Sequence, residues 1–190
     1  MNRPREKAVY ITPEDAWGLQ VWASDPQAGI IEQSHEQYDA FYEAIDQIIE
    51  DKIAREGQFF LFDLHTYNHR RDGSDGPVAD PEANPEVNIG TGTLDRDRWG
   101  HVVDRFIDDL RAADFQGRHL DVRENVKIKG GNFLRHINEK FGEHGLAIAV
   151  EYKKFFMDEW TGQRDVASTN AIQALLDATV QGMLETLIQA

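Results

Sequence analysis

The chain has 190 residues and a mass of 21.7 kDa, which suits a single domain over residues 1–190 with a sizeable core. Its net charge of -14 opposes binding to nucleic acid or anionic lipid, and no apolar run is long enough to span a membrane. Since no signal-peptide pattern opens the chain either, we expect a cytoplasmic protein. The absence of cysteine excludes disulfides and thiolates, and leaves histidine and carboxylates as the plausible metal ligands.

The first predicted elements are a short β-prone run at residues 9–12 and an amphipathic helix over residues 34–55. Apolar residues in the helix recur at spacings of three and four, which places them on one stripe. Ser34 and Gln37 fit a capping box at its start, and Gly57 fits a stop signal at its end.

Four consecutive apolar residues, 59–62, predict a strand buried on both faces. Groups at the carboxyl end of such a strand face the ligand crevice of an open α/β sheet. His65 follows there, with Asp63 two residues earlier, so it can be a metal ligand or a base whose ring a neighbour orients. A core histidine bonded to a backbone carbonyl is the alternative.

Residues 68–95 are rich in Gly, Pro, Asp and Asn, and we interpret them as a long active-site loop because they start at the strand end that carries His65. Arg70 and Arg71 near its base are candidates to bind a substrate carboxylate, since Arg favours bidentate pairing. A solvated arginine pair in a flexible loop is the alternative.

The second half predicts helices at 98–115 and 168–188, a half-buried strand at 120–126, and a third helix that ends at Gly142. Gly130 and Gly131 form the turn into that third helix, either for close approach to a ligand or as a plain tight turn. The apolar run 146–150 predicts a second buried strand, which ends at Glu151. Apolar surroundings can raise the pKa of Glu151 toward that of a general base, and an ion pair with Lys153 is the alternative.

Alternating strands and long helices predict an α/β fold, a three-layer α/β/α sandwich with a central mixed sheet. A more specific interpretation comes from five sequence segments that are spread over most of the chain: "NRPRE", "DLHTYNHRRDG", "NPEVNIGTG", "LDVRENVKIKGG" and "VEYKKFFMDEWTG". Through them the chain resembles the N-formylglutamate amidohydrolase family, which is similar to aspartoacylase and succinylglutamate desuccinylase. The resemblance implies a phosphorylase/hydrolase-like, zinc carboxypeptidase-like fold.

The resemblance also implies roles for residues of this chain. His65 matches a zinc ligand, and Glu151 matches the glutamate that acts as general base and then as general acid. Asn2 and Arg3 match a pair that binds the substrate and polarises its scissile carbonyl, and the Gly130–Gly131 pair resembles part of the substrate pocket.

In the family, a His-x-x-Glu type motif with two further zinc ligands precedes the Asn-Arg pair, whereas here that pair stands at positions 2 and 3. We therefore expect an N-terminally truncated domain. His35-Glu36 and His69 stand at the wrong place in the order of the motifs, although they, like the carboxylates of the loop, could approach the site in space. Truncation exposes a sheet edge or pocket wall, which makes a homo-oligomer plausible.

The expected function is zinc-dependent hydrolysis of an N-acyl amino acid, with N-formylglutamate giving formate and glutamate as the type reaction. One alternative is a truncated or non-catalytic member that keeps the fold without a catalytic metal. Another is a peptidase or amidase of the same fold with a different substrate.

Overall fold

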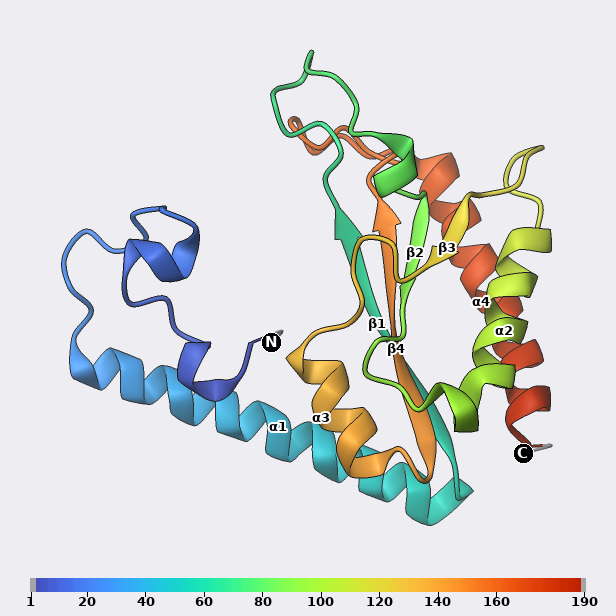
Figure 1. Ribbon diagram of the computed structural model, residues 1–190, viewed down its shortest axis with the longest axis horizontal. Helices are drawn as coiled ribbons and strands as arrows, with labels where there is room; N and C mark the ends of the chain where they lie inside the picture. Colours follow the sequence, from blue (N-terminus) through green and yellow to red (C-terminus); the bar gives the residue numbers. More distant parts are fainter. Residues whose placement is uncertain (1–2, 189–190) are drawn as a thin grey trace.

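The structure, a computed structural model, describes residues 3–188. A four-stranded mixed sheet lies between two pairs of helices, α1 with α3 on one face and α2 with α4 on the other (Figure 1). The predicted three-layer α/β/α fold with a mixed sheet is therefore confirmed. The helices and strands are α1 (Ala28–Glu56), β1 (Phe59–Tyr67), β2 (Val87–Gly90), α2 (Arg96–Ala112), β3 (Val122–Glu124), α3 (Asn132–Phe141), β4 (Gly145–Lys153) and α4 (Val166–Ile188).

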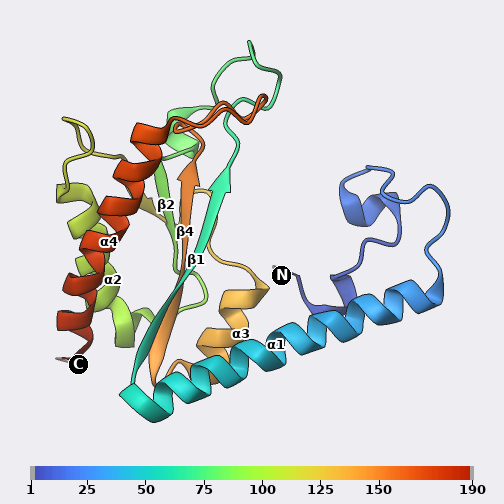
Figure 2. The same ribbon diagram turned by 180° about the vertical axis from the view of Figure 1, so that it is seen from behind.

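The strand order is β1-β4-β2-β3. The two apolar runs predicted to be buried strands, β1 and β4, are parallel neighbours, whereas β2 runs antiparallel to β4 and parallel to β3. Figure 2 shows the same sheet from behind, with β1 in front of β4. Because β1 and β4 are parallel, their carboxyl ends meet at the same end of the sheet.

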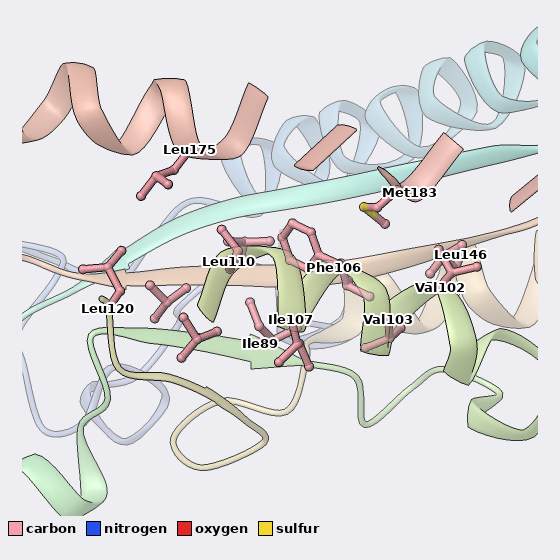
Figure 3. Packing of buried hydrophobic residues seen from close by; sticks show 14 of the residues in the cluster. Ile89, Val102, Val103, Phe106, Ile107, Leu110, Leu120, Leu146, Leu175 and Met183 are labelled. Atoms are coloured by element: carbon pink, nitrogen blue, oxygen red, sulfur yellow. The ribbon is translucent and has the colours of Figure 1, made fainter. Parts of the chain in front are cut away.

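The larger part of the core fills the space between the sheet and the α2/α4 pair (Figure 3). α2 carries its apolar side chains at helical spacing on the face it turns to the sheet, and Phe106 at its centre is fully buried. A smaller cluster packs α1 and α3 against the opposite face of β1 and β4. Within residues 3–188, none of the helices combines the length and the apolar character of a membrane span.

The predicted start of the first helix is wrong. α1 begins six residues earlier, after Gln27, so Ser34 lies inside the helix and its hydroxyl donates to the carbonyl of Ile30 at 2.8 Å. A serine side chain can hydrogen-bond to the backbone in the helix interior as well as at the N-cap. The capping-box pattern at Ser34 therefore predicted the wrong start for the helix. The predicted end at Gly57 is confirmed by its positive φ of 79°.

Two further expectations differ from the structure. Residues 9–12 form no strand, since they belong to an N-terminal segment that does not join the sheet. The predicted loop 68–95 contains the strand β2, whose four residues are all buried. β2 is too short, and too closely flanked by Asn, Pro and Gly, to show a strand pattern in the sequence.

Candidate functional site

The candidate site lies where β1 and β4 end. His65 and Glu151 are register partners in this parallel pair, so their side chains project from the same face, the one that α1 and α3 cover. Asp63 projects from that face as well, and its Oδ1 lies 2.7 Å from Nε2 of His65. The predicted orientation of the imidazole by the preceding carboxylate is therefore confirmed.

Glu151 is 4% exposed, although it is ionisable. Burial raises the pKa of its carboxyl above the ordinary value; the neighbouring His65 opposes this shift and the negative charge of Asp63 adds to it. A carboxyl whose pKa is raised in this way can accept a proton from water and return it to a leaving group. The raised pKa that the sequence predicted for Glu151 is therefore present in the structure.

Asn88 on β2 is the register partner of Glu151 on the other side of β4. Its side chain accepts a hydrogen bond from the Lys127 amide at 2.8 Å and donates one to the Ile128 carbonyl at 2.7 Å. These two bonds hold the segment that leads to Gly130 across the face of the sheet, beside Glu151. The sequence pattern missed Asn88, because β2 itself was not recognised.

Gly90 allows the close approach of this segment. A Cβ on Gly90 would lie 3.0 Å from the Gly130 nitrogen and 3.1 Å from the Cβ of Ala149. Gly130 itself has a φ of +112°, which side chains rarely permit, and Gly131 is the N-cap of α3. The predicted glycine turn therefore lies on the same face of the sheet as Glu151.

Positive charges collect at this end of the sheet. Lys153, two residues after Glu151 on the same face of β4, donates from Nζ to the Asn84 carbonyl at 2.9 Å. Nζ of Lys127 lies 4.9 Å from the ring centre of Tyr67 and bonds the Asn84 side chain. Burial lowers the pKa of Lys127, and the positive charge of Arg71 adds to this shift, which places Arg71 nearby. Lys127 was missed because nothing in its spacing sets it apart from a surface lysine.

Arg70 and Arg71, which were predicted as a pair, have different surroundings in the structure. The Arg70 guanidinium donates to the Gly76 carbonyl at 3.1 Å, inside its own loop. Its backbone carbonyl accepts from the Trp160 indole at 2.8 Å, and its amide donates to Glu159. Arg70 thus fastens the loop to the segment after β4, whereas Arg71 belongs to the positively charged group.

Arg3 lies in the N-terminal segment, and Asn2 lies outside the described residues. The Arg3 guanidinium stacks 4.5 Å from the ring centre of Tyr10 and 5.0 Å from that of Trp17. The Arg3 carbonyl accepts from the Tyr38 hydroxyl, which in turn accepts from Asn132, the residue after the glycine pair. The backbone of Arg3 is therefore linked to the start of α3, while its guanidinium contacts neither His65 nor Glu151 in the part of the chain that is described.

His65 and the carboxylates near it do not form a complete zinc site by themselves. Across residues 3–188, no three His, Asp or Glu side chains are grouped so that they could hold a metal ion. His65, Asp63 and Glu151 are near one another, but Nε2 of His65 already bonds Asp63. A zinc site with three protein ligands and one open position would need donors beyond these.

Fold and site together describe a three-layer α/β/α domain with a mixed sheet and a buried carboxyl at the carboxyl ends of two parallel strands. The family model of N-formylglutamate amidohydrolase matches residues 2–156, and the chain belongs to this family. No curated protein is similar enough in sequence to match the chain.

Two solved structures share the fold. The crystal structure of N-formylglutamate amidohydrolase from Ralstonia eutropha JMP134 has a TM-score of 0.66 and 16% identity, over 89% of this chain and 60% of that one. A gene product from Agrobacterium tumefaciens has a TM-score of 0.57 and 15% identity, over 96% of this chain and 66% of that one. The chain thus spans less than two thirds of the length of either structure.

Proposed function

We propose that this domain belongs to an amidohydrolase that cleaves the amide bond of an N-acyl amino acid. In this reaction the domain supplies the side chain that transfers protons. The observation that carries the proposal is Glu151, a buried carboxyl with a raised pKa at the carboxyl end of a central strand. Membership of the N-formylglutamate amidohydrolase family supports it, and makes N-formylglutamate the substrate to test first.

In the proposed reaction, Glu151 accepts a proton from a water molecule that attacks the amide carbonyl, and then returns the proton to the leaving amine. Asp63 holds the His65 ring in place beside Glu151. Arg71, Lys127 and Lys153 supply positive charge for the carboxylates of the substrate, in a chain that is acidic as a whole. Arg3 and the glycine pair stay proposed substrate-binding groups.

Zinc binding by His65 stays a proposal as well, since it requires ligands besides those grouped in residues 3–188. No step of the reaction proposed here uses the metal. The same finding favours a second function, a non-catalytic domain that binds N-acyl amino acids at the carboxyl ends of β1 and β4 without hydrolysing them.

The test is to incubate the purified 190-residue chain with N-formylglutamate, with and without added Zn²⁺, and to follow formate and glutamate by NMR. We expect turnover that Glu151→Gln abolishes and that Glu86→Gln, a glutamate exchange outside the site, leaves in place. N-acetylglutamate and N-formylglutamine in parallel define the acyl and charge preferences. Binding of N-formylglutamate without turnover in any condition would refute the enzyme and leave the non-catalytic function.

A further inference from the structure

Asn84 is a buried polar residue that takes no part in the proposed reaction. It is 6% exposed and follows the short helix Pro81–Ala83, shortly before the start of β2. Figure 1 shows this helix, in green, beside the upper end of β4. Asn84 therefore lies at the end of the sheet that also carries Glu151, and a buried amide there needs partners for its oxygen and its nitrogen.

The contacts of Asn84 fix the direction in which its side-chain amide points. Nδ2 donates to the Asp80 carbonyl at 2.8 Å, and the backbone amide donates to the Pro81 carbonyl at 3.2 Å. Because the nitrogen faces Asp80, Oδ1 faces the other way as an acceptor. The Nζ of Lys127 donates to this oxygen. The turn thus presents one amide oxygen to the positively charged end of the sheet.

Asn84 holds a second lysine through its backbone. The Nζ of Lys153 donates to the Asn84 carbonyl at 2.9 Å, so one residue binds two ammonium groups that come from different parts of the chain. Lys127 also lies over the ring of Tyr67, with its Nζ 4.9 Å from the ring centre. Tyr67 is the register partner of Lys153 at the end of β1. The two lysines are thus gathered at the point where β1 and β4 end.

Neither of these ammonium groups forms an ion pair with a carboxylate of residues 3–188. Their contacts are the two Asn84 oxygens and the Tyr67 ring, which are neutral. Lys140, by contrast, is paired with Asp46. Two like charges that are held close together repel each other, and this repulsion costs free energy unless an anion binds to both. The pair therefore has the character of a binding site for an anionic group of a ligand.

The distance from Glu151 indicates which group of a substrate the lysines reach. Lys153 lies beyond Glu151 on the same face of β4, about 7 Å away at the usual rise per residue of a strand. In N-formylglutamate the α-carboxylate is attached to the same carbon as the amide nitrogen, so it stays close to an amide that reacts at Glu151. The side-chain carboxylate is separated from that carbon by further bonds. It is therefore the carboxylate that matches the distance to the lysines.

We propose that Asn84 is a positioning residue, which holds Lys127 and Lys153 together as a binding site for the side-chain carboxylate of the substrate. This role rests on the proposed function, in which N-formylglutamate is the substrate to test first. Asn84 touches no reacting atom and acts only through the two lysines. It favours a substrate with two carboxylates over one whose side chain is neutral.

The first experiment compares N-formylglutamate with N-formylglutamine, whose side chain is neutral, in steady-state kinetics of the whole chain. Asn84→Asp keeps the shape of the side chain and places a carboxylate against Lys127, which cancels the lysine charge. We expect the KM for N-formylglutamate to rise about tenfold or more, and the KM for N-formylglutamine to change by less than about twofold. Because Asn84 does not contact Glu151, kcat should stay within about threefold of the wild-type value.

The matched control is Asn170→Asp, which adds the same charge at an exposed position of α4. This variant should leave both KM values unchanged. If Asn84→Asp leaves the KM for N-formylglutamate unchanged, or raises both KM values equally, Asn84 does not position a site for the side-chain carboxylate. Either result would overturn the proposal without affecting the proposed enzyme.

A binding measurement without turnover separates the role of Asn84 from the proposed function. In the Glu151→Gln background, isothermal titration calorimetry measures the dissociation constants of the same two compounds, and we expect Asn84→Asp to weaken N-formylglutamate about tenfold. A wild type without turnover, together with this loss of binding, would refute the enzyme and leave the role of Asn84. Turnover by the wild type, with a dissociation constant that Asn84→Asp does not change, would refute the role of Asn84 alone. A chain that binds no N-formylglutamate at all would overturn both.

A double-mutant cycle covers the case in which Asn84→Asp disturbs folding. Asn84→Leu adds no charge and removes the acceptor of Lys127, so it should weaken the binding of N-formylglutamate. We expect no further loss when it is combined with Lys127→Met, because both changes remove the same interaction. Losses that add up in the double variant would show that Asn84 acts on the fold in general, and would contradict its role as a positioning residue.

Discussion

Replacing Glu151 by glutamine should stabilise the protein while it abolishes activity. The variant keeps the size of the side chain and removes a charge that is 4% exposed and close to the negative charge of Asp63. Because burial raises the pKa of Glu151, the stability that its neutral form provides is complete below its ordinary pKa of 4.5 and is lost as the pH rises through the folded-state value. The advantage of the variant over the wild type therefore grows between the ordinary pKa and the folded-state pKa of Glu151, and is constant at higher pH.

Near neutral pH we expect a gain of about 1 kcal/mol in the free energy of unfolding, typical for removal of a strained functional group. For a domain of this size that raises the Tm by roughly 2–4 °C. Urea and thermal unfolding, followed by circular dichroism between about pH 4 and pH 8, measure the difference. A loss of stability at pH 7, or a gain that is independent of pH, would refute the argument that a buried charge at Glu151 destabilises the fold.

Glu86 is the matched control, with the opposite pH dependence. Burial alone would raise the pKa of Glu86, but two hydrogen bonds of 2.8 Å from Arg118 and one from the Asp121 amide outweigh burial and lower it. The stability that its charge provides is present above the ordinary pKa and is lost as the pH falls through the folded-state value. Glu86→Gln should thus cost about 1–2 kcal/mol near neutral pH and almost nothing in acid.

Three further variants test the core, the turn and the positive charges. Phe106→Ala should lower the free energy of unfolding by roughly 3–5 kcal/mol in urea titrations, because the ring is fully buried in the larger core; a loss below 1 kcal/mol would contradict that packing. Gly90→Ala should cost about 1–3 kcal/mol in the same assay, since its Cβ would meet the Gly130 nitrogen at 3.0 Å, and a neutral effect would show that the segment can move away. Lys127→Met should raise the KM for N-formylglutamate roughly tenfold with little change in kcat, and an unchanged KM would remove Lys127 from the substrate site.

Much of the fold could be predicted from the sequence, because apolar periodicity reflects burial directly. The runs at 59–62 and 146–150 gave both long strands, and the stripe around Phe106 gave α2. β2 could not be found in this way. Its neighbours in space, Glu151 on β4 and the segment at Lys127, lie far from it in the chain, and long-range pairing leaves no local pattern.

For the same reason, some residues of the candidate site could be predicted from the sequence and others could not. His65 and Glu151 were predictable because each follows a strong strand signal, and parallel pairing then placed them side by side. Lys127 and Asn88 depend on a bridge between a strand and a distant loop, which only the fold brings about. Arg70 was predicted as a substrate-binding residue because its side chain is chemically suitable. In the structure its guanidinium instead donates a hydrogen bond to the Gly76 carbonyl in its own loop.

The length of α1 has a consequence for how the protein opens. Its 29 residues extend over about 43 Å at the usual rise per residue, and its buried residues, Tyr38, Tyr42 and Ile49, lie in the second and third quarters of the helix. Protection from hydrogen exchange should therefore fall along one continuous helix toward Ala28. We expect the N-terminal segment, which contains Arg3 and Trp17, to open from α1 before the sheet unfolds.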